Sequence, residues 1–398
     1  MRYGRFTMTE QTTPRRTRPA DRKRQLATLA GTMFAEHGYA HVSVADIARA
    51  AGVTAPSVYR HFADKQALLV AAVLAGGDKL QACTDRMLAR PDCSLDDLAA
   101  ELAELGVSYP QTVSMWRANS AFLTEEQNTE ILLRTREIIE RWGAVIRANR
   151  PELGDRPAVR LAWAVLSVAG SLTVHHTKLS NTRAKAALHE LISRTLTLDT
   201  DTAPPFTAPA LPPSGDRNRR DEILDAASEL FADRGYTAVG IDDIGAAVGI
   251  SGPSVYNHFP SKLSILVSIA RRSATTLEAG VIAAYARTDK PLPLLRLLVD
   301  SYVAAITTRP DLIVGFRSAR ILAAQTDTAE HLDTQRRYVR RWIDLLRQVH
   351  PELSSEEAAV AVHSALSIVN DAVGMRRGTG RDEFTAEMAY LMKGVLGV

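Results

Sequence analysis

The chain has 398 residues, of which 46% are hydrophobic and 23% are charged, a composition typical of a soluble globular protein with an ample core. This length is enough for several domains. No apolar run reaches the roughly 20 residues of a membrane span, and no signal segment opens the chain, so we expect a cytoplasmic protein without membrane contact. The only two cysteines, Cys83 and Cys93, exclude a disulfide framework, and we expect buried thiols, no metal site and no cofactor.

Positive charge is concentrated at the N-terminal end of the chain. Residues 1–69 contain 11 Lys and Arg against 5 Asp and Glu, whereas residues 216–266 have a net charge of −3. A local basic excess is typical of a protein that binds a polyanion. Residues 1–20 are predicted to form a disordered basic arm, which either contacts DNA phosphates and the minor groove or is simply a solvated tail. Met1 and Met8 are both suitable starts.

A first helix is predicted at 21–37, where apolar residues recur with helical spacing. Gly38 is expected to end it in a left-handed C-cap, with Tyr39 folding back on the last turn. A second helix is expected to begin at Ser43, which forms a capping arrangement with Asp46 three residues later.

A tight turn at Gly52 is predicted to lead into a short third helix, residues 55–62, capped by Thr54. Asp64 is expected to cap a fourth helix. Two helices separated by a tight turn and supported by an N-terminal helix form the helix-turn-helix layout.

The short helix 55–62 has two kinds of side chain. Val58 and Phe62, four residues apart, can pack on the first two helices. The side chains left to face outward carry groups that contact phosphates or base edges. These are Ser57, Tyr59, Arg60 and His61.

Residues 95–197 are predicted to be entirely helical, and no stretch alternates with the period of two that a sheet requires. Residues 199–216 are rich in proline and are predicted to be a semi-rigid linker. We therefore expect an all-α protein.

The sequence pattern of the first half then repeats. Residues 249–262 repeat residues 52–65 at an offset of 197, and 19 of 48 positions are identical between 22–69 and 219–266. Beyond this segment the repeat continues at an offset of 200, where, for example, Arg341-Trp342 corresponds to Arg141-Trp142. The whole chain is a tandem duplication.

These residues resemble the TetR family of transcriptional regulators. The resemblance rests on Phe34, Gly38-Tyr39, the segment Ser57–Phe62 and Lys65, and on their counterparts around Ser254–Phe259 and Lys262. It implies an all-helical unit that dimerises through a four-helix bundle made from its last two helices. It also implies a ligand cavity among the middle helices and release of an operator when ligand binds.

We predict two TetR-like units, each with a three-helix helix-turn-helix domain followed by a helical ligand and dimerisation domain. The expected DNA-binding domains are 21–67 and 217–264, and the regulatory domains are 68–198 and 265–398. Ala158–Val174 and Ala184–Leu198 are expected to pack against Ala358–Val373 and Phe384–Leu396. One chain would then form an intramolecular pseudo-dimer, although two chains could still share a longer operator as a homodimer.

Both copies have a lysine in the first turn of the fourth helix, where a cation opposes the helix dipole. A phosphate bound at that helix start would reverse the effect. The alternative is that Tyr59 and Tyr256 are core aromatics and the lysines are ordinary surface residues. The predicted DNA contacts are Ser43, Thr54, Ala55, Pro56, Ser57, Tyr59, Arg60, His61, Lys65, Ser251, Gly252, Pro253, Ser254, Tyr256, Asn257, His258 and Lys262.

The two recognition helices differ where Arg60 is replaced by Asn257. Arginine favours guanine or phosphate and asparagine favours adenine, so we expect double-stranded DNA with an imperfectly palindromic operator. The acidic surroundings of the second motif favour the first as the stronger DNA contact.

A small apolar or amphipathic effector is the expected ligand of a cavity between helices, and a repressor is what the resemblance implies. The alternative is a ligand-blind regulator controlled by a protein partner or by its abundance. No nucleophile elbow, Walker loop, dinucleotide fingerprint or zinc-protease motif is present, so we do not expect an enzyme. The candidate ligand contacts, for which core packing is the alternative, are Trp116, Arg117, Phe122, Trp142, Trp163, His175, Phe316, Arg317, Tyr338, Trp342 and His363.

Overall fold

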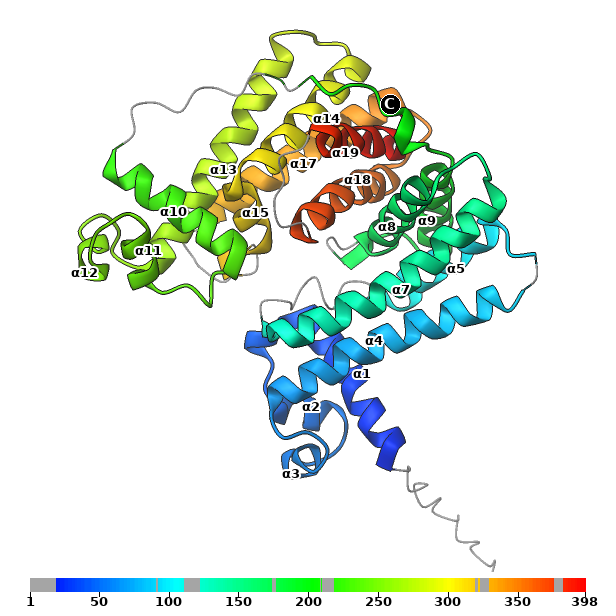
Figure 1. Cartoon of the computed structure of the whole chain (residues 1–398), viewed down its shortest axis with the longest axis horizontal. Coiled ribbons are helices and arrows are strands. Elements are labelled where there is room, and N and C mark those ends of the chain that lie inside the picture. The colour runs from blue at the N-terminus through cyan, green and yellow to red at the C-terminus, as the bar shows by residue number, and fades with distance from the viewer. Residues whose placement is uncertain are drawn as a thin grey trace, which may run out of the picture. The chain divides into compact units, whose positions relative to one another are not determined.

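The computed structural model describes residues 19–90, 92–110, 122–173, 177–207, 209, 218–318, 321–322, 329–375 and 382–398. Throughout these ranges the ordered elements are α-helices and short 3₁₀ turns, and no strand occurs among them, as the sequence predicts (Figure 1). The chain divides into two compact units, residues 1–75 and residues 76–398. Most of the predicted basic arm lies outside the described residues.

The first unit contains the first predicted DNA-binding domain. Its elements are α1 (Pro19–His37), η1 (Tyr39–His41), α2 (Val44–Ala50), α3 (Ala55–Tyr59) and the start of α4 (Lys65–Leu88). The capping box of Ser43 and Asp46 is present, with the Asp46 amide donating to Ser43 Oγ at 3.1 Å. Asp64 also caps α4 as predicted, because its Oδ1 accepts the Ala67 amide at 2.7 Å.

Two predicted caps differ from the structure. Thr54 occupies the N-cap position of α3 but makes no side-chain hydrogen bond to it. Pro56 removes the amide that such a bond would use, and the Ser57 amide donates instead to the Thr54 carbonyl at 2.9 Å. Gly38 has φ 83° and ψ 142°, so it uses a backbone region favoured by glycine but not the left-handed helical cap that the sequence suggested.

The second unit begins with the regulatory helices of the first half. After α4 these are α5 (Leu95–Ser108), α7 (Glu125–Asn149), α8 (Asp155–Ala169), η3 (Ser171–Thr173) and α9 (Asn181–Leu196). Cys83 is buried and Cys93 half-buried, both as free thiols, in line with the predicted role as small hydrophobic side chains. Burial and the nearby Glu101 carboxylate raise the pKa of Cys83 to about 12, so this thiol stays protonated.

The predicted linker is anchored where the structure describes it. It begins with a short turn, η4 (Thr200–Thr202), that contacts α8 and α19, and Thr200 is buried. Phe206 packs against the core of the unit. The first residues of the predicted semi-rigid linker are therefore held against the core by a buried threonine and a phenylalanine. Residues 208 and 210–217 lie outside the described part.

The second half repeats the order of helices found in the first half. Its second helix-turn-helix is built from α10 (Arg219–Arg234), α11 (Ile241–Ala247), α12 (Gly252–Val255) and α13 (Lys262–Tyr285). The regulatory helices are α14 (Pro291–Thr308), α15 (Pro310–Arg317), α17 (Ala329–Val349), α18 (Ser355–Met375) and α19 (Asp382–Leu396). A small core under the second helix-turn-helix includes Val314 and Leu322, so this domain shares its core with regulatory residues.

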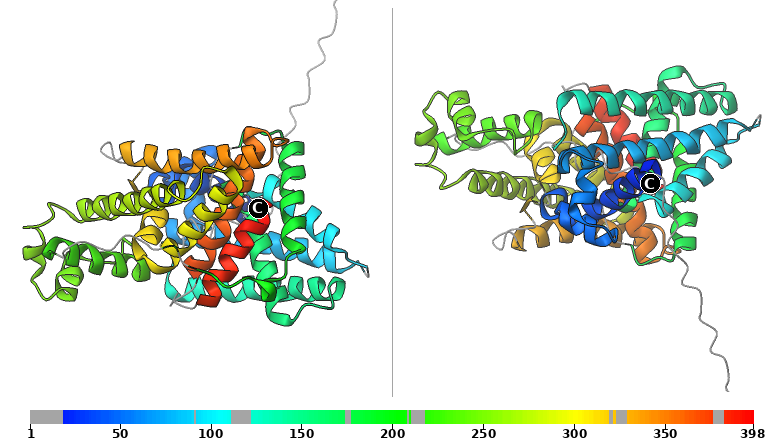
Figure 2. Two further views of the ribbon diagram at one scale, coloured as in Figure 1. Left: turned by 90° about the horizontal axis from the view of Figure 1, so that it is seen from above. Right: turned by 90° about the horizontal axis from the view of Figure 1, so that it is seen from below.

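One continuous apolar core joins the regulatory helices of both halves. Within it α8 and α9 contact α18, and α9 contacts α19, as the orange and red helices beside the green ones show (Figure 2). Ser171 Oγ lies 3.0 Å from Ser364 Oγ, and Arg194 donates to the Val395 carbonyl at 3.1 Å. The helix segments that the sequence paired across the two halves are therefore in contact.

Two helices, α4 and α18, are long and apolar enough to cross a membrane by length and composition. The sequence expectation considered only unbroken apolar runs and missed them, because each tolerates a few polar residues. In α18, 72% of the most apolar window is buried inside the protein, which is the usual situation of a core helix.

Candidate nucleic-acid interface

Each short recognition helix is held by two buried apolar side chains and presents its other residues outward. Val58 is 1% exposed and Phe62 4% exposed. Tyr59 is 53% exposed, and its counterpart Tyr256 is 52% exposed. The alternative that these tyrosines are core aromatics is therefore wrong, and a phenol ring stands on the solvent face of both copies.

A tyrosine–lysine pair supports each recognition helix from the side. Tyr39 packs edge-on against Phe34 with ring centroids 5.2 Å apart, and Lys65 Nζ lies 4.3 Å from the Tyr39 ring centroid. In the second copy Tyr236 lies 5.2 Å from Phe231, and Lys262 Nζ lies 4.4 Å from the Tyr236 ring centroid. In each pair the lysine ammonium group is attracted to the electron-rich face of the tyrosine ring.

This pairing explains the repeated lysine better than the helix dipole does. Partial burial against the ring lowers the pKa of both Lys65 and Lys262. The ammonium group thus fixes the start of the fourth helix to the turn after the first helix. Sequence reasoning missed the contact, although the Gly-Tyr dipeptide and the lysine recur together in both copies.

A second cation reaches each recognition helix from the first helix of its domain. Lys23 Nζ lies 5.7 Å from the Phe62 ring centroid. In the other copy the Arg220 guanidinium lies 4.1 Å from the Phe259 ring centroid and donates to the His258 carbonyl at 2.7 Å. The phenylalanine that buries the recognition helix is therefore also the platform for a basic residue.

The start of the recognition helix differs between the copies. Gly252, unlike its counterpart Ala55, is buried, and a methyl group there would overlap Asp242 Oδ1. The counterpart of Asp242 in the first copy is Ala45. The second recognition helix thus begins beside a carboxylate, which repels DNA phosphates, whereas the first does not.

The predicted DNA contacts fall on one side of each domain with different degrees of exposure. Gly252 is buried and has no side chain to offer, which restricts it to backbone contacts. The exposed ones are Ser43, Thr54, Pro56, Tyr59, Arg60, Ser251, Pro253, Tyr256 and Asn257, and the half-buried ones are Ala55, Ser57, His61, Lys65, Ser254, His258 and Lys262.

The second helix-turn-helix is tied to its regulatory helices by a half-buried arginine. Arg272 on α13 donates to both oxygens of Asp311 on α15, each at 2.6 Å, and to Asp225 on α10 at 2.7 Å. These two carboxylates raise the pKa of Arg272 against the opposing effect of its burial. One guanidinium therefore connects three helices.

Arg317, one of the candidate ligand contacts, also connects a regulatory helix to the second DNA-binding domain. Its guanidinium donates to the Ala232 carbonyl near the end of α10 at 2.9 Å. Desolvation lowers the pKa of Arg317, and the nearby Asp233 opposes that change. Arg317 therefore caps the first helix of the second DNA-binding domain, and its role as a ligand contact stays a prediction.

The candidate ligand contacts do not gather into one site. Trp142 is fully buried and donates to Thr84 Oγ1 at 3.0 Å, so it is a core residue. Trp163 lines a cavity between α8, α18 and α19. Half-buried positions hold Phe122, Phe316 and His363, and Trp116, Arg117 and His175 lie outside the described residues.

Tyr338 and Trp342 belong to a buried aromatic cluster in the second half. Their ring centroids are 5.9 Å apart, and Tyr302 completes the cluster at 6.0 Å from Trp342. Tyr302 donates to Asn370 Oδ1 at 2.7 Å, and burial raises the pKa of both tyrosines. A side-chain hydrogen bond with Trp342 acts on the pKa of Tyr338 in the opposite direction to burial.

The two DNA-binding regions match a known family model. Residues 28–72 and 223–269 both match the model for bacterial regulatory proteins of the tetR family. The chain belongs to the TetR family. Two TetR-like units therefore stand in tandem in one polypeptide.

TetR-family relatives match parts of the chain. The transcriptional activator FasR of Mycolicibacterium smegmatis is 40% identical over 84 residues, which cover 21% of this chain and 38% of FasR. The transcriptional repressor KstR2 of Mycobacterium tuberculosis is 30% identical over 132 residues, which cover 33% of this chain and 66% of KstR2. The chain thus matches less than half of FasR and about two thirds of KstR2.

Solved structures of TetR-family proteins also match parts of the chain. The ketosteroid transcriptional regulator KstR2 of Mycobacterium tuberculosis is 26% identical, with a TM-score of 0.41, and covers 46% of this chain and 95% of its own. A TetR-family regulator from Bordetella parapertussis is 21% identical, with a TM-score of 0.40, and covers 44% and 95%.

Proposed function

We propose that the protein is a DNA-binding transcriptional regulator in which a single chain supplies both recognition helices of the operator complex. The observation that carries this proposal is the duplicated recognition surface, with the same anchors and the same exposed tyrosine in each copy. Two TetR-family matches in one chain support it. Such a regulator works in the cytoplasm and carries no catalytic site.

The two halves form an internal pseudo-dimer in this proposal. Support comes from the shared core and from polar contacts that link the halves, including Arg183 to Glu357 at 3.0 Å and Arg160 to Glu387 at 2.9 Å. Sedimentation of the purified protein, free and with operator, should give one chain per operator. Complexes that contain only two chains would contradict this assembly.

The operator should be an imperfect palindrome. Arg60 and Asn257 differ in the bases that they favour, and Asp242 lies beside the second recognition helix alone. Selection of bound sequences from a random DNA library should therefore return two unlike half-sites. Half-sites that are identical and equally sensitive to mutation would contradict this prediction.

A small apolar or amphipathic effector is proposed to release the operator, which makes the protein a repressor. The buried aromatic cluster of Tyr302, Tyr338 and Trp342 supports such a ligand, because it places three large rings together in the regulatory core of the second half. KstR2 is described as a ketosteroid regulator, so steroid ketones belong in the first panel of compounds.

The alternative is a ligand-blind regulator controlled by a protein partner or by abundance. It is favoured by Trp142, whose indole fills the equivalent core of the first half and is already hydrogen-bonded. Release of a labelled operator by a compound at constant protein concentration would support the effector. Operator occupancy that follows protein concentration alone, across the whole panel, would support the alternative.

A further inference from the structure

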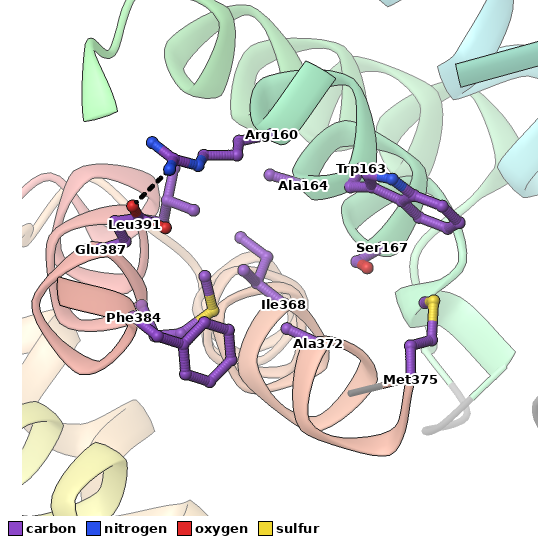
Figure 3. Close-up of a pocket in the computed structure, with 11 residues that line it drawn as sticks. Arg160, Trp163, Ala164, Ser167, Ile368, Ala372, Met375, Phe384, Glu387 and Leu391 are labelled. Carbon is purple, nitrogen blue, oxygen red and sulfur yellow. Dashed lines mark ion pairs between the residues drawn. The ribbon is translucent and has the colours of Figure 1, made fainter. Parts of the chain in front are cut away.

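A cavity lies between the two halves, away from the aromatic cluster. It has a volume of about 340 Å³ and is enclosed by α8 of the first half and by α18 and α19 of the second. Figure 3 shows Trp163 and Phe384 on opposite sides of it, with Ile368 and Ala372 of α18 between them. This volume falls in the range of about 300–1,000 Å³ that small-molecule sites occupy.

The walls are mainly apolar, with the Ser167 hydroxyl beside Trp163, and the charged groups gather at the other end. Arg160 on α8 pairs there with Glu387 on α19 at 2.9 Å, and only 13% of the Glu387 side chain is exposed. Arg160 also lies 3.4 Å from Asp201 of the linker. The dashed line in Figure 3 marks the Arg160–Glu387 pair at this end of the cavity.

A wider, charged space adjoins the same end. It has a volume of about 620 Å³ and shares Arg160, Trp163, Phe384 and Glu387 with the apolar cavity. Three arginines and four carboxylates line it. The route into the apolar cavity therefore passes an environment in which both charge signs are present and nearly balanced.

The duplication gives this cavity an equivalent position on the other side of the helix bundle, and that position is closed. At the offset of 200, Ala164 corresponds to Ser364, whose hydroxyl bonds Ser171, and Asp371 corresponds to Ser171. An alanine cannot form this bond, so the hydroxyl contact between Ser171 and Ser364 has no counterpart between Asp371 and Ala164. Consistent with this, α9 packs closely on α18, whereas α19 and α8 are among the helix pairs with few or no contacts.

The side chains of α19 preserve the opening. Phe384 and Glu387 replace Ala184 and Ala187 of α9, and Arg160 replaces Val360. On one side two alanines permit close packing. On the other, a phenylalanine and an ion pair hold the helices apart and leave a chamber with a polar end.

We infer that this cavity is a binding site for an uncharged apolar molecule with one hydrogen-bonding group, such as an alcohol. The apolar body fills the space between Trp163 and Phe384. The hydroxyl accepts a hydrogen bond from Arg160 and donates one to Glu387, so the ion pair stays intact and both its members gain a partner.

Charged head groups fit this site less well. A carboxylate near Arg160 would also lie near Glu387 and Asp201, and an ammonium near Glu387 would lie near Arg160. Either ion would lose its hydration and meet a like charge in a partly buried site. A neutral polar group avoids both costs.

The test uses three naphthalene probes that differ in their head groups: naphthalenemethanol, naphthoate and naphthylmethylammonium. Equilibrium dialysis against the full chain should show that the alcohol binds at least about fivefold more tightly than either ion, the factor expected for one net hydrogen bond. Equal binding of the three probes, tighter binding of either ion, or binding by none of them, overturns the inference.

Two substitutions locate the probe. Ala372→Phe should fill the chamber and abolish binding of the alcohol, while Ala186→Phe, on the exposed face of α9, should leave it unchanged. Retained binding in Ala372→Phe that unfolds like the wild type overturns the assignment.

Glu387→Gln should increase the affinity for naphthoate, a result that a misfolded variant would not give. Without the carboxylate, Arg160 can accept an anionic partner, so naphthoate should bind at least about fivefold more tightly than it does to the wild type. An unchanged or weaker affinity for naphthoate contradicts the role of the ion pair.

The link from this cavity to gene regulation rests on the proposed function, whereas probe binding does not. Operator binding by the same preparations, measured with and without the alcohol, separates the two. Probe binding without any operator binding would refute the proposed function alone. Operator binding without probe binding would refute the cavity alone.

Discussion

The two DNA-binding regions are nearly the same in what supports the recognition helix and differ in what surrounds it. The tyrosine lies 5.2 Å from its phenylalanine in both copies, and the lysine lies 4.3 or 4.4 Å from the tyrosine ring. The repeated residues are thus mainly those that hold the short helix in place. Among the exposed residues of the recognition helix the tyrosine is shared, whereas Arg60 and Asn257 differ, and residues that reach neighbouring helices have diverged.

The divergence is clearest in how each region connects to other helices. The second helix-turn-helix shares its core with α15 and is bridged to it by Arg272. At the matching positions the first copy has Ala75 for Arg272 and Thr28 for Asp225, which cannot form ion pairs. The second region belongs to the large unit, while the first is a compact unit of its own. A change in the regulatory helix α15 therefore has a direct polar route to α10, the first helix of the second DNA-binding domain.

Arg272→Ala should have the largest effect on this difference. The substitution leaves Asp311, which is 4% exposed, as a buried carboxylate without its guanidinium. Loss of one partner from a buried pair costs about 3–5 kcal/mol, and we expect about 3 kcal/mol because Arg272 keeps some contact with water. Urea unfolding followed by circular dichroism measures the loss.

The neighbouring Arg271 is exposed and supplies the matched control for that experiment. Arg271→Ala should change the free energy of unfolding by less than about 0.5 kcal/mol. Hydrogen exchange should show faster opening of α10 in Arg272→Ala but not in the control. Equal stability of the two variants would mean that the bridge does not hold the second domain.

Arg60→Ala and Asn257→Ala compare the two recognition helices directly. Arg60 combines an exposed guanidinium with a basic domain, whereas Asn257 shares its domain with Asp242 and a net negative charge. Loss of an arginine contact costs about 1–3 kcal/mol, so Arg60→Ala should weaken operator binding about tenfold or more. Asn257→Ala should weaken it about threefold, the effect of a single neutral hydrogen bond.

Gel-shift titrations at several salt concentrations test this ranking. If Arg60 contacts a phosphate, its loss should also reduce the salt dependence by about one unit of slope, which Asn257→Ala should not do. A larger loss of affinity from Asn257→Ala would reverse the proposed order of the two half-sites.

Sequence reasoning predicted most of the fold because the signals were local and repeated. The capping box at Ser43, the cap at Asp64 and the inward Val58 and Phe62 all follow from spacing within a few residues. The pairing of the bundle helices followed from the duplication. The absence of strands in the described chain followed from the apolar period.

The cavity and the arginine bridges depend on contacts between distant segments, which spacing does not reveal. Arg160 and Glu387 are far apart in the sequence, and their pairing depends on how α8 and α19 cross. Arg317 was predicted as a candidate ligand contact, and its hydrogen bond to the end of α10 could not be seen from spacing. The sequence did offer one signal for such bridges: a charged residue in one half without a charged counterpart in the other, such as Arg272, which corresponds to Ala75.

The helix caps give the smallest effect and compare the two regions at a single position. Ser43 caps α2, and its counterpart Gly240 caps α11 without a side chain, although the Asp46 and Asp243 carboxylates act alike. Ser43→Ala should destabilise α2 by about 1 kcal/mol, and Gly240→Ser should stabilise α11 by about 0.3 kcal/mol. Hydrogen exchange of the α2 and α11 amides measures both changes.

Acid should weaken both caps. The pKa of Asp46 is lowered by hydrogen bonds from Ser43, and that of Asp243 by the Gly240 amide. A carboxylate whose pKa is lowered by folding contributes stability above its unfolded pKa and loses it as the pH falls through the folded value. The difference between Ser43→Ala and the wild type should therefore shrink towards about pH 3, near the bottom of the ordinary range for aspartate. An undiminished difference in acid would show that the Ser43 hydroxyl stabilises α2 without the Asp46 carboxylate.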